Sequence, residues 1–354
     1  MHRRALLAAP AAAASALAAP LPAAAQQSGA APRIVSEDLM VPSRDPGIEL
    51  FLRNKRPEAL GAFAPNRTLL FVHGATYPAH TAFDLPLGGV SWMDYIAARG
   101  FDVWCLDVRG YGRSTRPPEM ARPANESPPV AGGETAVRDI SAAADFIRGR
   151  RGVPRLAVMG WSWGTTLMGR YAADNPELVE RVVLFAPLWT LQSAPPISSG
   201  PGPLGAYRTV TQAAARQRWL NGVPEDKKAT LIPAGWFEQW AEATWASDPE
   251  AARRDPPALR APNGVLQDLA DHWAPGKPPF YDPAKITAPA LLVLAEWDRD
   301  TPLHMATTLF PLLANSPGKR LVVLGEGTHT VVMERNRGAL FQAVQLFLEE
   351  SPAA

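Results

Sequence analysis

Residues 160–164, Gly-Trp-Ser-Trp-Gly, place a serine between glycines in a pattern that is typical of a catalytic nucleophile. The apolar run 155–159 predicts a buried strand before this segment, and residues 165–174 predict a helix after it. Because a sharp strand-to-helix turn crowds the backbone, glycines on either side let the two elements approach closely. Ser162 would then lie at the start of a helix, where partial positive charge favours a developing anion. The alternative is a glycine-rich turn with a solvated serine.

Acyl transfer by a serine also requires a base that takes its proton and a carboxylate that orients this base. His329 is the candidate base, because it directly follows a late apolar strand in a loop that contains glycine. Asp298 is the candidate acid, because the acid is expected early in its loop, where another apolar strand ends. Asp300 and Glu296 are the alternatives in the same loop. The sequence therefore predicts Ser162, His329 and Asp298 as a catalytic set.

The oxyanion formed during acyl transfer needs hydrogen-bond donors, and the backbone N–H groups of Trp163 and Ala75 are the candidates. Trp163 follows the serine directly, and Ala75 lies in the loop after an early apolar strand. A backbone donor places little demand on its side chain, so alanine is compatible with this role. His73, two residues before Ala75, is expected to support the loop rather than to act as a base.

Four side chains are candidates for lining a substrate pocket: Tyr77, His80, Trp161 and Trp189. Tyr77 and His80 lie in the same loop as Ala75, and the alternative for both is an exposed loop surface. Concave apolar walls hold small organic ligands, so tryptophans at the pocket indicate an apolar or aromatic substrate. The alternative for each tryptophan is packing in the core.

The elements that must position these residues alternate between strand and helix along most of the chain. Strands are expected at 34–42, 48–57, 68–72, 101–108, 155–159, 181–185, 289–295 and 319–324. Helices are expected at 91–99, 134–150, 165–174, 303–313 and 338–350. This alternation, with later strands apolar throughout, predicts an α/β fold with a parallel sheet that helices cover on both faces. Ligands bind beyond the carboxyl ends of such strands, where the candidate catalytic residues would meet.

The alternation stops between residues 188 and 288, a segment that contains six tryptophans and several prolines. About a hundred residues are too many for a loop without structure of its own. We therefore expect an inserted helical lid at 188–288, with helices near 216–220 and 236–245. The α/β core would then comprise residues 26–187 and 289–354.

Residues 1–25 predict an export signal rather than a part of the fold. Arg3 and Arg4 give a basic start, residues 5–19 are apolar and rich in alanine, and alanines 23–25 suit cleavage. The protein is then expected to be periplasmic or secreted, and the two arginines are compatible with twin-arginine export. Removal of this segment takes away two arginines and no acids, so the formal charge changes from +1 to −1. The alternative is a disordered, alanine-rich tail.

Composition argues against several classes of partner. The 35 basic and 34 acidic residues nearly balance, without a basic run that would indicate a nucleic acid. After the export signal, no stretch is long and apolar enough to predict a membrane span. The single cysteine, Cys105, lies in the apolar run 101–108 and is expected to be a small core residue.

Together these motifs resemble the α/β-hydrolase superfamily, in its lid-containing, serine esterase and lipase-like subgroup. The matching segments are His73-Gly74, residues 107–114, residues 160–164, Asp298 with Pro302, and His329. They follow the family's order of serine, aspartate and histidine. The resemblance implies a mostly parallel, eight-stranded sheet and an acyl-enzyme mechanism without a metal or organic cofactor. It also implies a structural role for Asp107 and Arg109.

The predicted function is hydrolysis of a carboxylic ester of an apolar or aromatic small molecule. Residues 160–164 are also similar to the matching segment of proline iminopeptidases, which carry Gly-Gly-Pro-Gly after the first-loop histidine. This chain has Ala-Thr-Tyr-Pro at 75–78 instead. Haloalkane dehalogenases and epoxide hydrolases of the superfamily have aspartate where this chain has Ser162. Amide, peptide or lactone hydrolysis remains an alternative, as does a ligand-binding or sensor protein of this fold without turnover.

Overall fold

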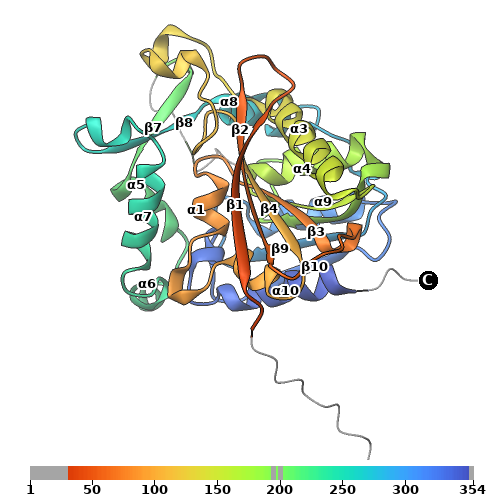
Figure 1. Cartoon of the computed structure of the whole chain (residues 1–354). Helices are drawn as coiled ribbons and strands as arrows, with labels where there is room; N and C mark the ends of the chain where they lie inside the picture. Colours follow the sequence, from red (N-terminus) through yellow and green to blue (C-terminus); the bar gives the residue numbers. More distant parts are fainter. Residues whose placement is uncertain (1–30, 193–196, 198–201, 351–354) are drawn as a thin grey trace, which may run out of the picture. The chain divides into compact units, whose positions relative to one another are not determined.

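An eight-stranded sheet in the order β1-β2-β4-β3-β5-β6-β9-β10 carries the loops that contain the candidate catalytic residues (Figure 1). Its strands are β1 (Ile34–Pro42), β2 (Glu49–Pro57), β3 (Thr68–Val72), β4 (Asp102–Asp107), β5 (Leu156–Trp161), β6 (Val179–Phe185), β9 (Ala290–Ala295) and β10 (Arg320–Leu324). β2 runs antiparallel to both of its neighbours, and the pairs from β4 to β10 are parallel. The predicted α/β fold with a mostly parallel, eight-stranded sheet is confirmed.

The computed structural model describes residues 31–192, 197 and 202–350. The sheet and its helices belong to one compact unit that begins at Pro32. The export signal predicted at 1–25 lies outside the described residues. None of the helices within the described ranges is both long and apolar enough to cross a bilayer.

The central strands are buried on both faces, which explains why their sequences are continuously apolar. β3, β4, β5 and β9 are buried at every residue. Because side chains alternate along a strand, Leu70 and Val72 of β3 pack into one hydrophobic core, whereas Leu69 and Phe71 pack into a second. The sheet therefore separates two cores, and its polar loops are left at the strand ends.

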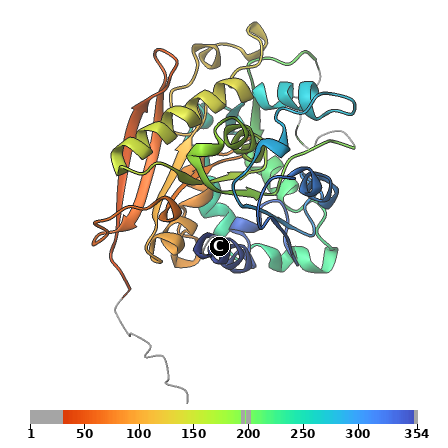
Figure 2. The ribbon, with the colours of Figure 1, turned by 90° about the vertical axis from the view of Figure 1, so that its right-hand side faces the viewer.

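Helices cover both faces of this sheet. The first core includes residues of α3 (Gly133–Arg151), α4 (Trp163–Asp174) and α9 (Leu303–Leu312). The second includes residues of α1 (Ala79–Phe83), α2 (Trp92–Ala97) and α10 (Arg337–Glu349). Figure 2 shows β1 and β2, in red and orange, at one edge of the sheet. This layering fixes the strand ends on which the candidate residues lie.

Between β6 and β9, residues 188–288 form a segment that we call the insert. It contains α5 (Gln212–Trp219), α6 (Glu225–Leu231), α7 (Trp236–Ala246) and α8 (Gly264–Asp268). It also contains β7 (Tyr207–Thr211) and β8 (Ala258–Pro262), an antiparallel pair that the sequence analysis did not predict. In Figure 1, α5 and α7 lie beside α1, and Thr244 Oγ1 of α7 bonds Thr81 Oγ1 of α1 at 3.0 Å. The insert therefore packs next to the loop that follows β3.

Candidate active site

Ser162 occupies a sharp turn between β5 and α4. Its backbone has φ 57° and ψ −123°, a conformation that costs energy for any residue other than glycine. A Cβ on Gly160 would lie 2.1 Å from the carbonyl oxygen of Gly164, and a Cβ on Gly164 would lie 2.5 Å from that of His73. Only glycine fits at either position. The predicted strand–turn–helix arrangement around Ser162 is therefore present.

His329 follows β10 and Asp298 follows β9, and their side chains meet. Nδ1 of His329 lies 2.9 Å from Oδ2 of Asp298. The Asp298 carboxylate also accepts hydrogen bonds from the N–H groups of Asp300 and Thr301, both at 2.8 Å, and from the Thr301 hydroxyl at 2.8 Å. The bond to Asp298 assigns the ring proton to Nδ1, which leaves Nε2 of His329 able to accept a proton.

Ser162 and His329 line the same cavity, and these residues are only 7% and 8% exposed to solvent. Within the described ranges, no hydrogen bond joins the Ser162 hydroxyl to the His329 ring. Nε2 of His329 instead lies 3.8 Å from Oδ2 of Asp300. Catalytic hydrogen bonds are often long without substrate, so this geometry is compatible with a base that has not yet engaged its nucleophile.

A partly buried ion pair between the acid loop and the insert lies beside His329. Asp300 pairs with the Arg218 guanidinium of α5, which also donates to Thr76 Oγ1 at 3.4 Å. Burial raises the pKa of Asp300, but Arg218 and His329 outweigh this effect and lower it overall. Burial lowers the pKa of His329, but Asp298 and Asp300 outweigh that effect and raise it overall. Three neighbouring charges thus tune the candidate base.

Hydrogen bonds to backbone and side-chain groups hold the loop after β3 in place. His73 Nδ1 lies 2.7 Å from the Gly74 oxygen, and His73 Nε2 accepts from the Val108 N–H at 3.1 Å, as expected for a supporting residue. Burial lowers the pKa of His73, which favours its neutral form. The Ala75 oxygen accepts from Tyr111 at 2.9 Å and from Arg208 of β7 at 2.8 Å. These bonds fix the backbone orientation of the loop.

The two candidate oxyanion donors are both available. Trp163 is the first residue of α4, so its N–H has no acceptor inside the helix. In the part of the chain that the structure describes, neither this N–H nor that of Ala75 donates to a carbonyl or side chain. Ala75 and Trp163 line a cavity together with Ser162. Both N–H groups are therefore left without an acceptor in the described residues, and both residues share a cavity with the nucleophile.

The structure separates the four candidates for the substrate pocket into two groups. Tyr77 and Trp161 line the cavity that holds Ser162 and His329. Trp161 also donates from Nε1 to the carbonyl oxygen of His329 at 3.1 Å. The backbone of the candidate base is thus attached to a wall of the cavity.

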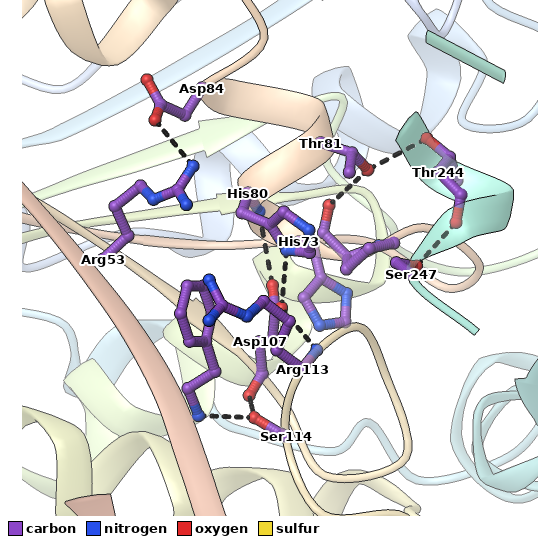
Figure 3. A network of polar contacts seen from close by, with 12 residues as sticks. Arg53, His73, His80, Thr81, Asp84, Asp107, Arg113, Ser114, Thr244 and Ser247 are labelled. Carbon is purple, nitrogen blue, oxygen red and sulfur yellow. Dashed lines mark hydrogen bonds and ion pairs between the residues drawn. The ribbon is translucent and has the colours of Figure 1, made fainter. Parts of the chain in front are cut away.

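The expectation that His80 and Trp189 line this cavity is corrected by the structure. Nδ1 of His80 lies 2.7 Å from Asp107 Oδ2, and Figure 3 shows its ring directed toward that carboxylate. Trp189 packs against Trp273 and Tyr281, with ring centroids 5.1 and 5.4 Å away. Asp107 is distant in sequence from His80, and Trp273 and Tyr281 are distant in sequence from Trp189, which explains the error.

The sequence analysis missed Arg218, Arg208 and Glu334. Glu334 is fully buried, and its carboxylate accepts from the Trp219 indole at 2.8 Å and the Thr328 N–H at 3.0 Å. Burial raises the pKa of Glu334. This residue thus connects the loop of His329 to the insert. Its position shortly after the candidate base was the one available signal, whereas the two arginines resemble ordinary polar residues of a solvated segment.

Comparison with known proteins identifies the family. The model of the alpha/beta hydrolase fold family matches residues 67–335, so this chain belongs to that family. Human Lipase member K is 29% identical over 136 residues, which are 37% of this chain and 34% of the human protein. The chain therefore matches only about a third of that relative's length.

Two solved structures extend the likeness over nearly the whole chain. For 2-hydroxy-6-oxo-6-phenylhexa-2,4-dienoate hydrolase from Rhodococcus sp., the TM-score is 0.59 at 18% identity, covering 89% of this chain and 99% of that one. For a thermophilic esterase from Thermogutta terrifontis, the TM-score is 0.53 at 16% identity, covering 88% and 98%. At such identities the likeness shows the fold alone. The family and the human lipase together support a hydrolase.

Proposed function

We propose that this protein is a serine hydrolase that cleaves carboxylic esters through an acyl-enzyme intermediate. Ser162 is the nucleophile, His329 the base and Asp298 the acid that orients the base. The observation that carries the proposal is the His329–Asp298 hydrogen bond beside the cavity in which Ser162 occupies a strained turn. Asp298 is favoured over Asp300, because it contacts Nδ1 while Asp300 is engaged by Arg218.

In the first half-reaction, Nε2 of His329 takes the proton of the Ser162 hydroxyl as its oxygen attacks the ester carbonyl. The N–H groups of Ala75 and Trp163 stabilise the resulting oxyanion, and one such donor is worth about 2.7–4 kcal/mol in the barrier. The intermediate then expels the alcohol, which receives the proton from Nε2. Water attacks the acyl-enzyme by the same route and releases the acid.

Asp298 supports both steps by holding the Nδ1 proton and stabilising the charged imidazole. For the first step, Nε2 of His329 must move from the neighbourhood of Asp300 to the Ser162 hydroxyl. The apolar and aromatic walls of the cavity, which include Tyr77 and Trp161, support an apolar ester as the substrate. The basic start and alanine-rich run at 1–25 support the further proposal that the protein is exported.

A fluorophosphonate label and a substrate panel test this proposal. We expect the label on Ser162, located by peptide mass spectrometry, and hydrolysis of esters in preference to lactones and proline arylamides. Ser162→Ala should lose both labelling and turnover while it stays folded. Ser141→Ala in α3, whose hydroxyl bonds the Val137 carbonyl, is the control and should retain both.

Several outcomes would oppose the proposal. Esterase activity retained by Ser162→Ala would place the reaction elsewhere. Preferred cleavage of arylamides or lactones would support the alternative hydrolases. A folded protein that binds esters but neither turns them over nor reacts at Ser162 would support a binding or sensor protein.

A further inference from the structure

Ser162 lies where two cavities of different chemistry meet. The first, which we call the aromatic cavity, is lined by His329 and by Tyr77, Trp161, Ala215, Trp219 and Trp240. The second, the aliphatic cavity, is lined by Trp163 and by Leu188, Leu191, Val265 and Leu269. Ser162 and Ala75 line both cavities. An ester attached to Ser162 therefore faces both cavities.

The reaction geometry decides which group enters which cavity. The leaving oxygen must approach Nε2 of His329 to receive its proton, and His329 lines the aromatic cavity. The oxyanion must approach the N–H groups of Trp163, which lines the aliphatic cavity, and of Ala75, which lines both cavities. The acyl substituent extends from the reacting carbon away from the leaving oxygen. Hence the leaving group belongs on the aromatic side and the acyl chain on the aliphatic side.

The ion pair between Arg218 and Asp300 lies at the boundary, because both residues line both cavities. Thr76 and the acid loop anchor its two ends. A partly buried charged pair is a poor neighbour for hydrocarbon but tolerates the polar ester group. The pair therefore disfavours one continuous apolar chain through both cavities, and favours a substrate with two apolar groups joined by a polar centre.

The aromatic cavity also has fixed walls. Nε1 of Trp219 donates to Glu334 at 2.8 Å, and the Trp219 and Trp240 rings meet edge to face with centroids 5.1 Å apart. Rigid indole faces favour a flat aromatic ring through stacked or edge contacts. The aliphatic side chains opposite favour flexible hydrocarbon through burial of apolar area.

We propose that the preferred substrate is an aryl ester of an alkanoic acid, with its aryl group in the aromatic cavity and its alkyl chain in the aliphatic cavity. This inference rests on the proposed esterase function. One water is consumed, the ester C–O bond breaks, and a phenol-type alcohol and a carboxylic acid are released.

Two substitutions that reduce the space in one cavity each test the assignment. Leu269→Phe narrows the aliphatic cavity and Ala215→Phe the aromatic cavity. One ester series varies the acyl chain from phenyl acetate to phenyl hexanoate, and another varies the alcohol from methyl to naphthyl butyrate. Ratios of kcat/KM within a series do not depend on how much of a variant is folded.

We expect Leu269→Phe to lower the hexanoate-to-acetate ratio by roughly 10- to 200-fold and to leave the naphthyl-to-methyl ratio unchanged. Ala215→Phe should lower the naphthyl-to-methyl ratio and leave the acyl-chain ratio unchanged. If Leu269→Phe lowered the naphthyl-to-methyl ratio and Ala215→Phe lowered the hexanoate-to-acetate ratio, the assignment would be reversed and the proposal overturned. A pair of variants in which neither ratio changes would also overturn the proposal.

A crystal structure of the unsubstituted protein, after reaction of Ser162 with a hexylphosphonate, tests the same assignment without variants. The hexyl chain should lie against Val265 and Leu269. A chain lying against Trp219 and Trp240 would overturn the inference while the proposed function still held. If the reagent failed to modify Ser162, the proposed function itself would be contradicted.

Discussion

Two histidine–aspartate pairs lie at strand ends of this sheet. His80 Nδ1 lies 2.7 Å from Asp107, at the end of β4, and His329 Nδ1 lies 2.9 Å from Asp298, after β9. The two contacts are nearly equal in length, but the surroundings of the two histidines differ. His329 lines the cavity of Ser162, whereas the His80 ring packs edge-on against Phe51 at 5.5 Å. A histidine–aspartate contact alone therefore does not identify a catalytic base, and the group beside the other ring nitrogen is what distinguishes the two pairs.

Substitution of the two histidines should give the largest contrast. His329→Gln removes the proposed base, and we expect kcat to fall by roughly 10⁵- to 10⁶-fold. His80→Gln breaks the bond to Asp107 and should lower the free energy of unfolding, with kcat per folded enzyme nearly unchanged. Ester hydrolysis and urea unfolding measure the two effects. A large loss of kcat in folded His80→Gln would end the distinction between the pairs.

Substitution of the two aspartates should give the next largest contrast. Asp298→Asn favours the tautomer in which Nε2 of His329 already carries a proton, so kcat should fall by roughly 10⁴-fold. Asp107→Asn removes a carboxylate that also accepts from the Arg113 N–H at 3.1 Å, and should affect stability instead. Steady-state kinetics on samples with equal folded fractions measure kcat of the two variants. Equal losses of kcat in the two variants would contradict a special role for Asp298.

The third carboxylate near the site, Asp300, should set the pH dependence. The reaction needs neutral His329, so activity rises as pH passes upward through the raised pKa of this histidine. Asp300→Asn removes a negative charge, lowers this pKa and should move the acidic limb of kcat/KM to lower pH. Arg218→Gln removes a positive charge and should move the limb to higher pH. Shifts in the same direction would contradict this electrostatic account.

Asp268 is a half-buried carboxylate that forms no hydrogen bond with a histidine among the described residues, and its effect should be the smallest. It accepts from the Trp163 indole at 2.9 Å and from the Gly133 N–H, and burial raises its pKa to about 6. Because the folded pKa exceeds the ordinary value of 3.8, its contribution to stability is present below about pH 4 and is lost as pH rises through about 6.

Asp268→Asn should therefore flatten the decline in unfolding free energy between about pH 4 and 6, measured by urea unfolding at several pH values. Asp226→Asn, at an exposed carboxylate in α6 of the same insert, is the control and should keep the decline. An unchanged pH dependence in Asp268→Asn would show that this carboxyl does not bear the burial penalty.

The sequence predicted the sheet well because its central strands are buried on both faces and read as continuous apolar runs. The segments around Ser162, Asp298 and His329 could be found because each directly follows such a strand. The insert was harder to predict. β7 and β8 pair across residues 207–262, and Arg260 and Arg208 within them carry buried charges that interrupt an apolar pattern.

Contacts between distant segments could not be predicted. Asp300 and Arg218 are 82 positions apart, and nothing in either segment indicates that they pair. His80 was placed in the pocket because it shares a loop with Tyr77, but a helical turn in α1 directs these side chains to different neighbours. Local patterns therefore predicted which loops meet, whereas tertiary packing decided which side chains face the cavity.

The most direct test of the account is rapid-quench mass spectrometry of the unsubstituted protein during hydrolysis of an aryl ester. We predict that one acyl group accumulates before steady state and that it is found on the peptide containing Ser162. Turnover with no acyl group on that peptide, or with the acyl group on another residue, would contradict the central claim.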